Sequence, residues 1–199
     1  NPYKYCDLKR PARDIFTKAH RDAARRIAAE SFVLLKNDNV TLRPGTPAEP
    51  LLPFNPKGNI AVIGPLADAA HDQMGTWVFD GEKAHTQTVL VALKKMYGDK
   101  VRIIYEPGLG YSRDKHTAGI AKAVNAAMRA DAVLVCAGEE SILSGEAHSL
   151  ADLHLQGAQS ELIAALAKTG KPLVTVVMAG RPLTIGQEVE QSDAVLYAF

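Results

Sequence analysis

The chain has 199 residues, of which 47% are hydrophobic and 23% are charged, and its formal net charge at pH 7 is +1. This is the composition of a globular protein with a sizeable core, and the nearly neutral charge provides no bulk attraction to nucleic acids or anionic membranes. No apolar run approaches the roughly 18 residues of a transmembrane helix, and the first ten residues lack the apolar stretch of a signal peptide.

The N-terminal part is expected to contain a helix and an extended connection. Hydrophobic residues recur on one face over residues 17–35, which predicts an amphipathic helix. Prolines then follow at intervals of three over residues 41–58. Because proline fixes φ and lacks an N–H group, we expect an extended strap without regular structure, packed on the domain as a surface connection.

From residue 59 the pattern alternates between strands and helices. Strands are predicted at residues 59–63, 101–105, 132–137, 173–178 and 194–197, and helices at residues 88–97, 117–129 and 158–168. The strands are unbroken apolar runs, as expected for strands buried on both faces. The sequence therefore predicts an α/β fold: a three-layer α/β/α sandwich with a mostly parallel sheet of about five to six strands.

Residues 1–58 are interpreted as a linker from a preceding domain and residues 59–199 as the sandwich domain, which we expect to be truncated at its C-terminus. The chain opens on a polar stretch without an initiator Met and stops in an apolar run. We therefore expect it to be a segment of a larger protein.

Common motifs of parallel α/β proteins are missing. The dinucleotide fingerprint needs three glycines after a strand, and the stretch from Gly108 to Arg113 supplies only two. The phosphate-binding loop and the nucleophile elbow are absent too. His148, Asp152 and His154 do not form the paired spacing of a metal site, so no metal and no cofactor is expected.

The most informative stretch is the long connection at residues 138–156, GEESILSGEAHSLADLHLQ. Ordered connections of this length are usually functional, and in a parallel sheet ligands bind beyond the carboxyl ends of the strands. Glu139 comes directly off the preceding strand, so we expect it to anchor the start of the loop. Glu146 lies between Gly145 and Ala147, and these small neighbours leave its side chain free to reach another surface. On composition alone, a solvated loop glutamate is the favoured interpretation of Glu146.

A second long connection, residues 66–85, holds the only tryptophan of the chain, Trp77, close to Asp80. An aromatic ring beside a carboxylate is suited to stack on a sugar while the acid accepts hydrogen bonds from hydroxyl groups. The alternative is a tryptophan that packs its own loop against the domain.

Several stretches resemble glycoside hydrolase family 3 in order and spacing. They are AESFVLLKN at residues 29–37, IAVIGPLAD at 60–68, MGTW at 74–77, the GE…GEAHSLAD loop at 138–152 and GRPL at 180–183. The similarity runs from about residue 21 to residue 199, and the bacterial β-glucosidases and β-xylosidases of the family are the most similar in character.

The resemblance implies that this chain is the second domain of an exo-acting, retaining β-glycosidase, most specifically a β-glucosidase. In that family an N-terminal (β/α)8 barrel of the same protein carries the nucleophilic aspartate, and the following sandwich domain carries the acid/base glutamate on a long loop. By its place in the loop, Glu146 matches the acid/base residue. Trp77 matches a residue on the aglycone side.

The expected site residues fall into three groups. The catalytic residue is Glu146; the substrate-binding residues are Trp77, Asp80 and His148; and the loop is supported by Glu139, Asp152 and Arg181. The expected partners are a β-linked glucoside or oligosaccharide and the barrel, without nucleic acid or membrane. The segment alone is expected to be inactive, and the resemblance favours a periplasmic or secreted protein over a cytoplasmic one.

Two positions depart from the family pattern. Many relatives have a basic residue in place of Leu150 and an asparagine in place of Ala179, so a possible brace of the loop is missing. Two other readings stay open: a non-catalytic α/β module that binds a sugar or another small ligand, and a flavodoxin-like signalling domain, against which the long acidic loop argues.

Overall fold

The computed structural model describes residues 1–42, 45–56 and 58–199. These residues form two compact units, Asn1–Phe32 and Val33–Phe199, and each is described by itself. The unit that contains the sheet thus begins before the domain boundary that we expected at residue 59. That residues 1–58 connect the domain to a barrel stays a prediction.

The first unit is helical. It contains α1 (Pro2–Tyr5), α2 (Arg10–Asp14) and α3 (Lys18–Ser31). The hydroxyl of Thr17 accepts a hydrogen bond from the backbone N–H of His20 at 3.3 Å and so caps the start of α3. The prediction of a helix from residue 17 is confirmed as far as Ser31.

The prediction is wrong for residues 32–35, because α3 ends at Phe32 in an extended conformation and β1 (Val33–Asn37) follows at once. This strand pairs antiparallel with β8 (Ala194–Ala198). Its apolar run continues the helical pattern in the sequence. Only the pairing with a strand more than 150 residues away makes this segment a strand and not the last turn of the helix.

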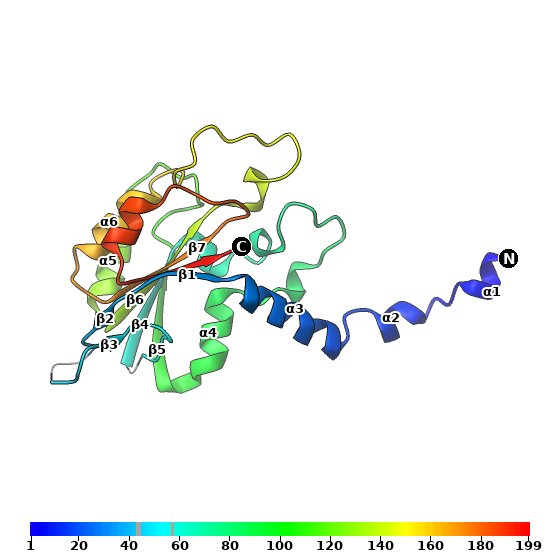
Figure 1. The fold of residues 1–199 in the computed structure, drawn as a ribbon, viewed down its shortest axis with the longest axis horizontal. Coiled ribbons are helices and arrows are strands. Elements are labelled where there is room, and N and C mark those ends of the chain that lie inside the picture. The colour runs from blue at the N-terminus through cyan, green and yellow to red at the C-terminus, as the bar shows by residue number, and fades with distance from the viewer. Residues whose placement is uncertain (43–44, 57) are drawn as a thin grey trace. The chain divides into compact units, whose positions relative to one another are not determined.

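The second unit is built around a six-stranded sheet with the order β1-β8-β7-β6-β4-β5 (Figure 1). Besides β1 and β8 it contains β4 (Gly58–Ile63), β5 (Val101–Glu106), β6 (Ala132–Gly138) and β7 (Leu173–Met178). All pairings except that of β1 are parallel. The predicted strands and the mostly parallel sheet are confirmed, with β6 in the interior and buried along its whole length.

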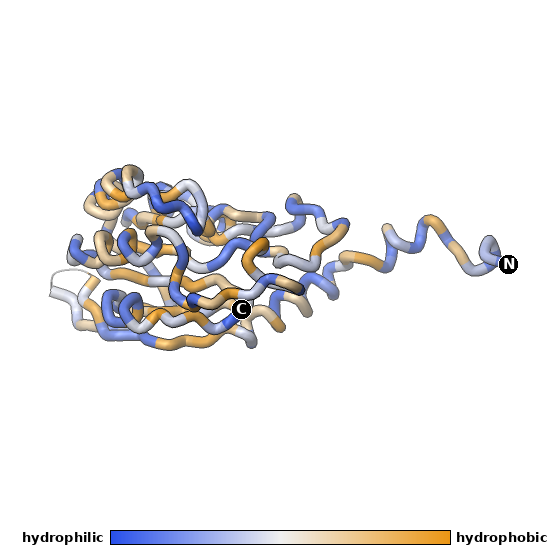
Figure 2. Tube along the Cα trace, turned by 90° about the horizontal axis from the view of Figure 1, so that it is seen from above, coloured by the Kyte–Doolittle hydropathy of each residue, from blue (hydrophilic) through white to orange (hydrophobic). Residues whose placement is uncertain are grey.

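Helices cover both faces of the sheet. On one face, α5 (Ile120–Met128) and α6 (Gln159–Ala167) contribute Ala123, Leu162 and Ile163 to the larger hydrophobic core. On the other face, Leu90 of α4 (Val89–Tyr97) belongs to the second core. The hydrophobic residues of the strands lie between these layers (Figure 2).

Three short helices were not expected: α1, α2 and α7 (Gly186–Gln191). They have only four to six residues, which is too short for a helical periodicity to show in the sequence. The described residues also form five single-turn 3₁₀ helices: η1 (Pro65–Asp68), η2 (Asp72–Met74), η3 (Lys83–His85), η4 (Gly98–Lys100) and η5 (Ser141–Leu143).

The proline-rich strap packs on the sheet domain. Leu51 is buried in the second core, and the side chain of Asn37 bonds both the N–H and the C=O of Leu52, at 2.8 and 2.9 Å. The prediction of no regular structure is wrong at Glu49–Pro50, where β3 pairs with β2 (Asn39–Val40), and at Gly58, the first residue of β4. Arg43, Pro44 and Lys57 lie outside the described residues.

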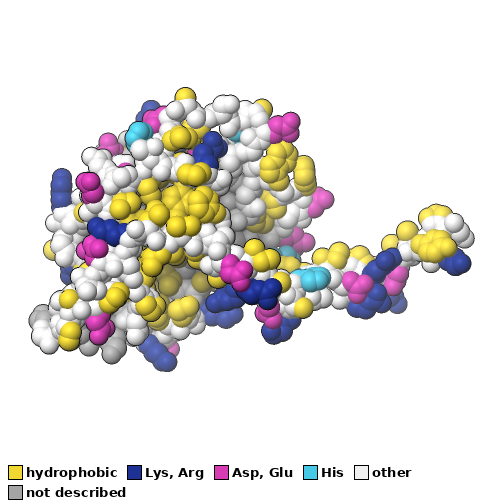
Figure 3. Space-filling model, viewed as in Figure 1, with side chains coloured by type: hydrophobic (Ala, Val, Ile, Leu, Met, Phe, Trp, Pro, Cys, Tyr) yellow, Lys and Arg dark blue, Asp and Glu magenta, His cyan; other side chains and the backbone are white. Residues whose placement is uncertain are grey.

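The edge strand β1 leaves hydrophobic side chains in contact with solvent. Val33, Leu34 and Leu35 are each about half exposed, and Figure 3 shows hydrophobic side chains reaching the surface over this part of the sheet. At the carboxyl ends of the parallel strands, by contrast, long polar connections leave the sheet (Figure 1). These connections carry the expected site residues.

Candidate active site

The long loop begins at a fixed strand end. Gly138, the last residue of β6, has a φ of +138°, and a Cβ atom there would lie 1.9 Å from the carbonyl oxygen of Met178. Only glycine allows this close approach of two strands. The buried side chain of Gln159 also bonds both backbone groups of Gly138, donating to its C=O at 2.9 Å and accepting from its N–H at 2.8 Å.

Directly after this strand end, the buried carboxylate of Glu139 forms an ion pair with Arg181, which is partly exposed. The Nε atom of Arg181 lies 3.2 Å from Oε2 of Glu139, whose side chain is only 3% exposed. The other carboxylate oxygen, Oε1, has no hydrogen-bond partner among the described residues. The stability of this buried carboxylate therefore depends on the charge of Arg181, because an unpaired buried charge is strongly unfavourable.

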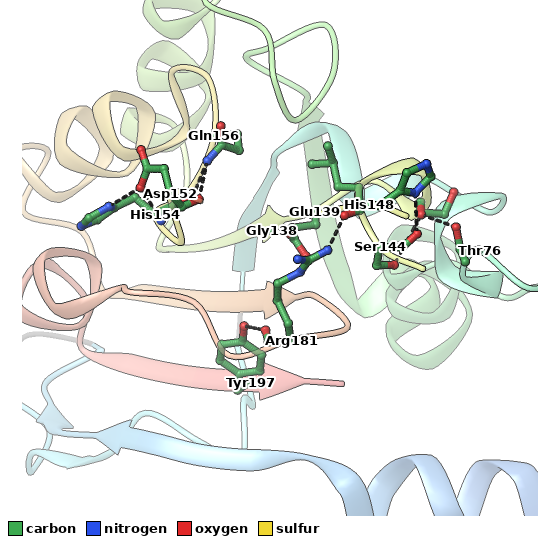
Figure 4. A network of polar contacts seen from close by, with 12 residues as sticks. Thr76, Gly138, Glu139, Ser144, His148, Asp152, His154, Gln156, Arg181 and Tyr197 are labelled. Carbon is green, nitrogen blue, oxygen red and sulfur yellow. Dashed lines mark hydrogen bonds and ion pairs between the residues drawn. The ribbon is translucent and has the colours of Figure 1, made fainter. Parts of the chain in front are cut away.

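Arg181 connects three parts of the domain (Figure 4). Its guanidinium also donates to the carbonyl oxygen of Leu143 in the loop, and its own carbonyl accepts from the hydroxyl of Tyr197 at 2.5 Å. Through these contacts, the ion pair of Glu139 and Arg181 connects the first turn of the loop to the end of β6 and to β8. The structure brings Glu139 and Arg181 together, and their role as loop support stays a proposal.

Glu146 lies at the tip of the loop. Its side chain is exposed, and no hydrogen bond or ion pair within the described part of the chain involves its carboxylate. The backbone on both sides is in the left-handed region, with φ of +110° at Gly145 and +62° at Ala147. For alanine this conformation costs about 1–2 kcal/mol, so Glu146 lies in a tight turn between two residues of positive φ.

His148 and Asp152 belong to local turns instead of a common cluster. Nδ1 of His148 lies 3.0 Å from the carbonyl oxygen of Ser144. Oδ1 of Asp152 accepts from the backbone N–H of His154 at 3.0 Å and lies 2.6 Å from its Nδ1. These hydrogen bonds, first of all the one from the backbone, lower the pKa of Asp152.

Asp152 marks the point where the loop returns to the domain. The next residues are pinned by an isolated parallel bridge between His154 and Thr184, and Thr184 donates its N–H to Leu153 at 2.8 Å. Figure 4 shows Asp152 and His154 well apart from Glu139 and from His148. Any support from Asp152 therefore acts on the exit of the loop, not on its base.

The tryptophan connection leaves β4, the neighbour of β6 in the sheet. Trp77 is 62% exposed and Phe79 is 88% exposed, and their ring centroids are 6.3 Å apart. The alternative of a tryptophan packed down on its loop does not fit a ring with this exposure. Asp80 is exposed beside this aromatic pair, and the described contacts include no bond to its carboxylate.

Sequence reasoning missed Gln159, Phe79 and the residues that join the two loops, Asp72 and Ser141. The sequence gives no signal for Gln159, because an amide in a helix looks like a surface residue. For Phe79 the one signal in the sequence is its position two residues after Trp77.

Within the described residues, no group of three His, Cys, Asp or Glu side chains is placed to hold a metal ion, and no described helix is long and apolar enough to cross a membrane.

The comparison with known families decides the identity of the domain. Residues 32–199 match the model of the glycosyl hydrolase family 3 C-terminal domain. The chain belongs to glycoside hydrolase family 3. The order of the motifs, the sheet and the long loop after β6 all agree with this assignment.

Relatives in the family include both glucosidases and xylosidases. The chain is 38% identical to the periplasmic beta-glucosidase of Salmonella typhimurium over 90% of its length, which is 25% of that protein. It is 35% identical to a beta-xylosidase of Formosa agariphila, again over 90% of this chain and 24% of the relative. The chain thus spans about a quarter of the length of the curated relatives it matches.

Solved structures agree with the fold. The beta-glucosidase from Listeria innocua superposes with a TM-score of 0.82 at 30% identity, covering 98% of this chain and 25% of that one. An exo-beta-xylosidase of the family, XlnD, gives a TM-score of 0.75 at 26% identity over 90% of this chain and 22% of that one.

Proposed function

We propose that this family 3 domain provides the acid/base glutamate, Glu146, of an exo-acting, retaining β-glycosidase. A (β/α)8 barrel of the same protein would carry the nucleophilic aspartate. The proposal rests mainly on one observation: Glu146 is exposed and unpaired within the described chain, at the tip of a loop whose base is buried and bonded. Such a carboxylate is available to a second surface.

The chemistry follows from a pair of carboxyl groups about 5–5.5 Å apart. The barrel aspartate attacks the anomeric carbon while Glu146 protonates the leaving oxygen, and the resulting glycosyl-enzyme is hydrolysed by water that Glu146 deprotonates. Glu146 must start protonated. The barrel would have to cover the loop tip to bring the two carboxyl groups to this separation.

The other proposed contacts are made with the leaving group of the substrate. Trp77 offers an exposed ring for stacking on the leaving-group sugar, and Asp80 and His148 offer polar groups on the two loops. Glu139, Arg181 and Asp152 support the loop. Because the nucleophile and the acid would lie on different domains, we expect residues 1–199 alone to hydrolyse no aryl β-glycoside.

A β-glucoside is the proposed substrate, and the periplasm or the outside of the cell the proposed location. Both are supported by the Salmonella relative, which is named a periplasmic beta-glucosidase. A xyloside is the alternative, because a beta-xylosidase is also similar. Rates on matched aryl β-glucosides and β-xylosides with the full-length protein decide between them, and binding without hydrolysis would favour a non-catalytic sugar module.

The role of Glu146 is tested with Glu146→Ala in the full-length protein. We expect kcat/KM to fall by roughly 10²–10⁴-fold for phenyl glycosides, whose leaving group needs a proton, and far less for dinitrophenyl glycosides, which leave unaided. Glu190→Ala is the matched control, since Glu190 is an exposed glutamate on α7. An equal loss for both leaving groups would refute the assignment.

A further inference from the structure

The two loops of the site leave neighbouring parallel strands. The tryptophan loop follows β4, the acid/base loop follows β6, and Ile63 near the end of β4 pairs with Val135 of β6. Their short helical turns, η2 and η5, then meet outside the sheet. Two loops that start side by side do not have to stay together, so their association depends on direct contacts between them.

Ser141 of η5 is bonded by two residues of the tryptophan loop. Its backbone N–H and its hydroxyl both donate to Oδ1 of Asp72, at 2.9 and 3.1 Å. The hydroxyl of Thr76 donates to the carbonyl oxygen of Ser141 at 2.7 Å. The donor and acceptor groups of one residue are thus used to join the loops.

A packing contact lies beside these hydrogen bonds. Gly145 has a φ of +110°, and a Cβ atom at this position would lie 2.4 Å from Cγ2 of Thr76. Thr76 directly precedes Trp77, and Gly145 directly precedes Glu146. The contact between the loops therefore adjoins both the exposed aromatic ring and the proposed acid/base residue.

We propose that Thr76 and Asp72 are positioning residues that hold Glu146 through Ser141 and Gly145, and that they make the two loops one unit. The inference rests on the proposed function of Glu146. Thr76 then places the acid relative to the ring of Trp77, so a leaving-group sugar that stacks on the ring meets the acid at a defined distance. Neither residue takes part in the proton transfer itself.

The test uses the full-length protein with Thr76→Val, which keeps the shape of the side chain but removes the hydroxyl. We expect kcat/KM for phenyl glycosides to fall about tenfold, the scale of one hydrogen bond, and to fall less than about twofold for dinitrophenyl glycosides. Thr76→Ser, which keeps the hydroxyl, should restore most of the activity. Thr117→Val, at an exposed threonine before α5, is the matched control.

Glu146→Ala, alone and combined with Thr76→Val, is measured in the same series. If Thr76 acts through Glu146, Thr76→Val causes no further leaving-group-dependent loss once the carboxylate is gone. If Glu146→Ala shows the leaving-group dependence but Thr76→Val affects both substrates equally, or neither, the positioning role is wrong and the proposed function stands. If Glu146→Ala shows no such dependence, the proposed function fails and the inference fails with it.

The second variant is Gly145→Ala, which places a methyl group against Thr76. We expect it to displace Glu146, to reproduce the leaving-group-dependent loss, and also to lower the melting temperature, because alanine is strained at this positive φ. Unchanged activity of Gly145→Ala on phenyl glycosides would overturn the proposal, since the contact between the loops would then not control the acid.

Discussion

The base and the tip of the acid/base loop are built in opposite ways. At the base, Gly138 and Glu139 are buried and bonded by Gln159 and Arg181. At the tip, Glu146 is exposed and its carboxylate has no bond within the described chain. The difference agrees with the proposed division of roles, in which the buried start of the loop fixes its position and the tip would supply a carboxylate to another domain.

The largest effect is expected from Gly138→Ala, which breaks the base. Its Cβ would lie 1.9 Å from the carbonyl oxygen of Met178 at a φ of +138°, so the substitution adds a backbone clash to conformational strain. We expect the free energy of unfolding to fall by more than about 3 kcal/mol, measured by urea denaturation of the full-length protein.

Gly170→Ala is the control for strain alone. Its φ is +66° and no atom lies within 4 Å of the added Cβ, so we expect a loss of about 1 kcal/mol. Equal losses for the two variants would show that the close contact of β6 and β7 is not what fixes the loop's base.

The next effect concerns the buried ion pair. Arg181→Met leaves the Glu139 carboxylate buried without its cation, which we expect to cost about 3 kcal/mol of unfolding free energy. Activity should fall alike for good and poor leaving groups, since Glu139 and Arg181 support the loop in this proposal and do not transfer the proton. Glu139→Ala is expected to show the same uniform pattern.

The double variant Glu139→Gln with Arg181→Met separates charge from packing. With the buried charge removed, it should be more stable than Arg181→Met alone. A double variant that is less stable, by thermal or urea unfolding, would contradict the importance of the buried charge.

The smallest effect is expected at the exit of the loop. Hydrogen bonds from His154 lower the pKa of Asp152 below its ordinary value of 3.8. Because the folded pKa is lower than the unfolded one, the stabilisation is present above about pH 4 and is lost as the pH falls through the folded pKa. The side chain of Asp152 is 70% exposed, so the contribution is small.

Asp152→Asn should therefore lower the melting temperature by no more than about 2 °C at pH 6, and the difference should shrink as the pH falls below 4. Asp99→Asn, at an exposed aspartate in η4, is the control. A difference that grows on acidification would show that the sign of the pKa shift is wrong.

The sequence predicts the regular parts of the fold well and the non-local parts poorly. The apolar runs of β6 and β7 indicated buried parallel strands, because burial on both faces leaves a local pattern. The run Val33-Leu34-Leu35 indicated a helix, because only its antiparallel partner β8 makes it a strand. Local periodicity contains no information about that partner.

The candidate site also has a local part that the sequence predicts and a non-local part that it does not. The exposure of Glu146 follows from its small neighbours, Gly145 and Ala147, which the sequence displays. The bonds of Ser141 to Asp72 and Thr76 join residues 65 or more positions apart, and they depend on the parallel pairing of β4 and β6. Such contacts become visible only in three dimensions.

The most direct test of the central role of Glu146 is rescue of Glu146→Ala by azide in the full-length protein. Azide needs no general base, so it should replace the activated water, restore turnover of a dinitrophenyl glycoside and yield a β-glycosyl azide. No rescue, or rescue of Glu139→Ala in place of Glu146→Ala, would contradict the assignment of the acid/base residue to the tip of the loop.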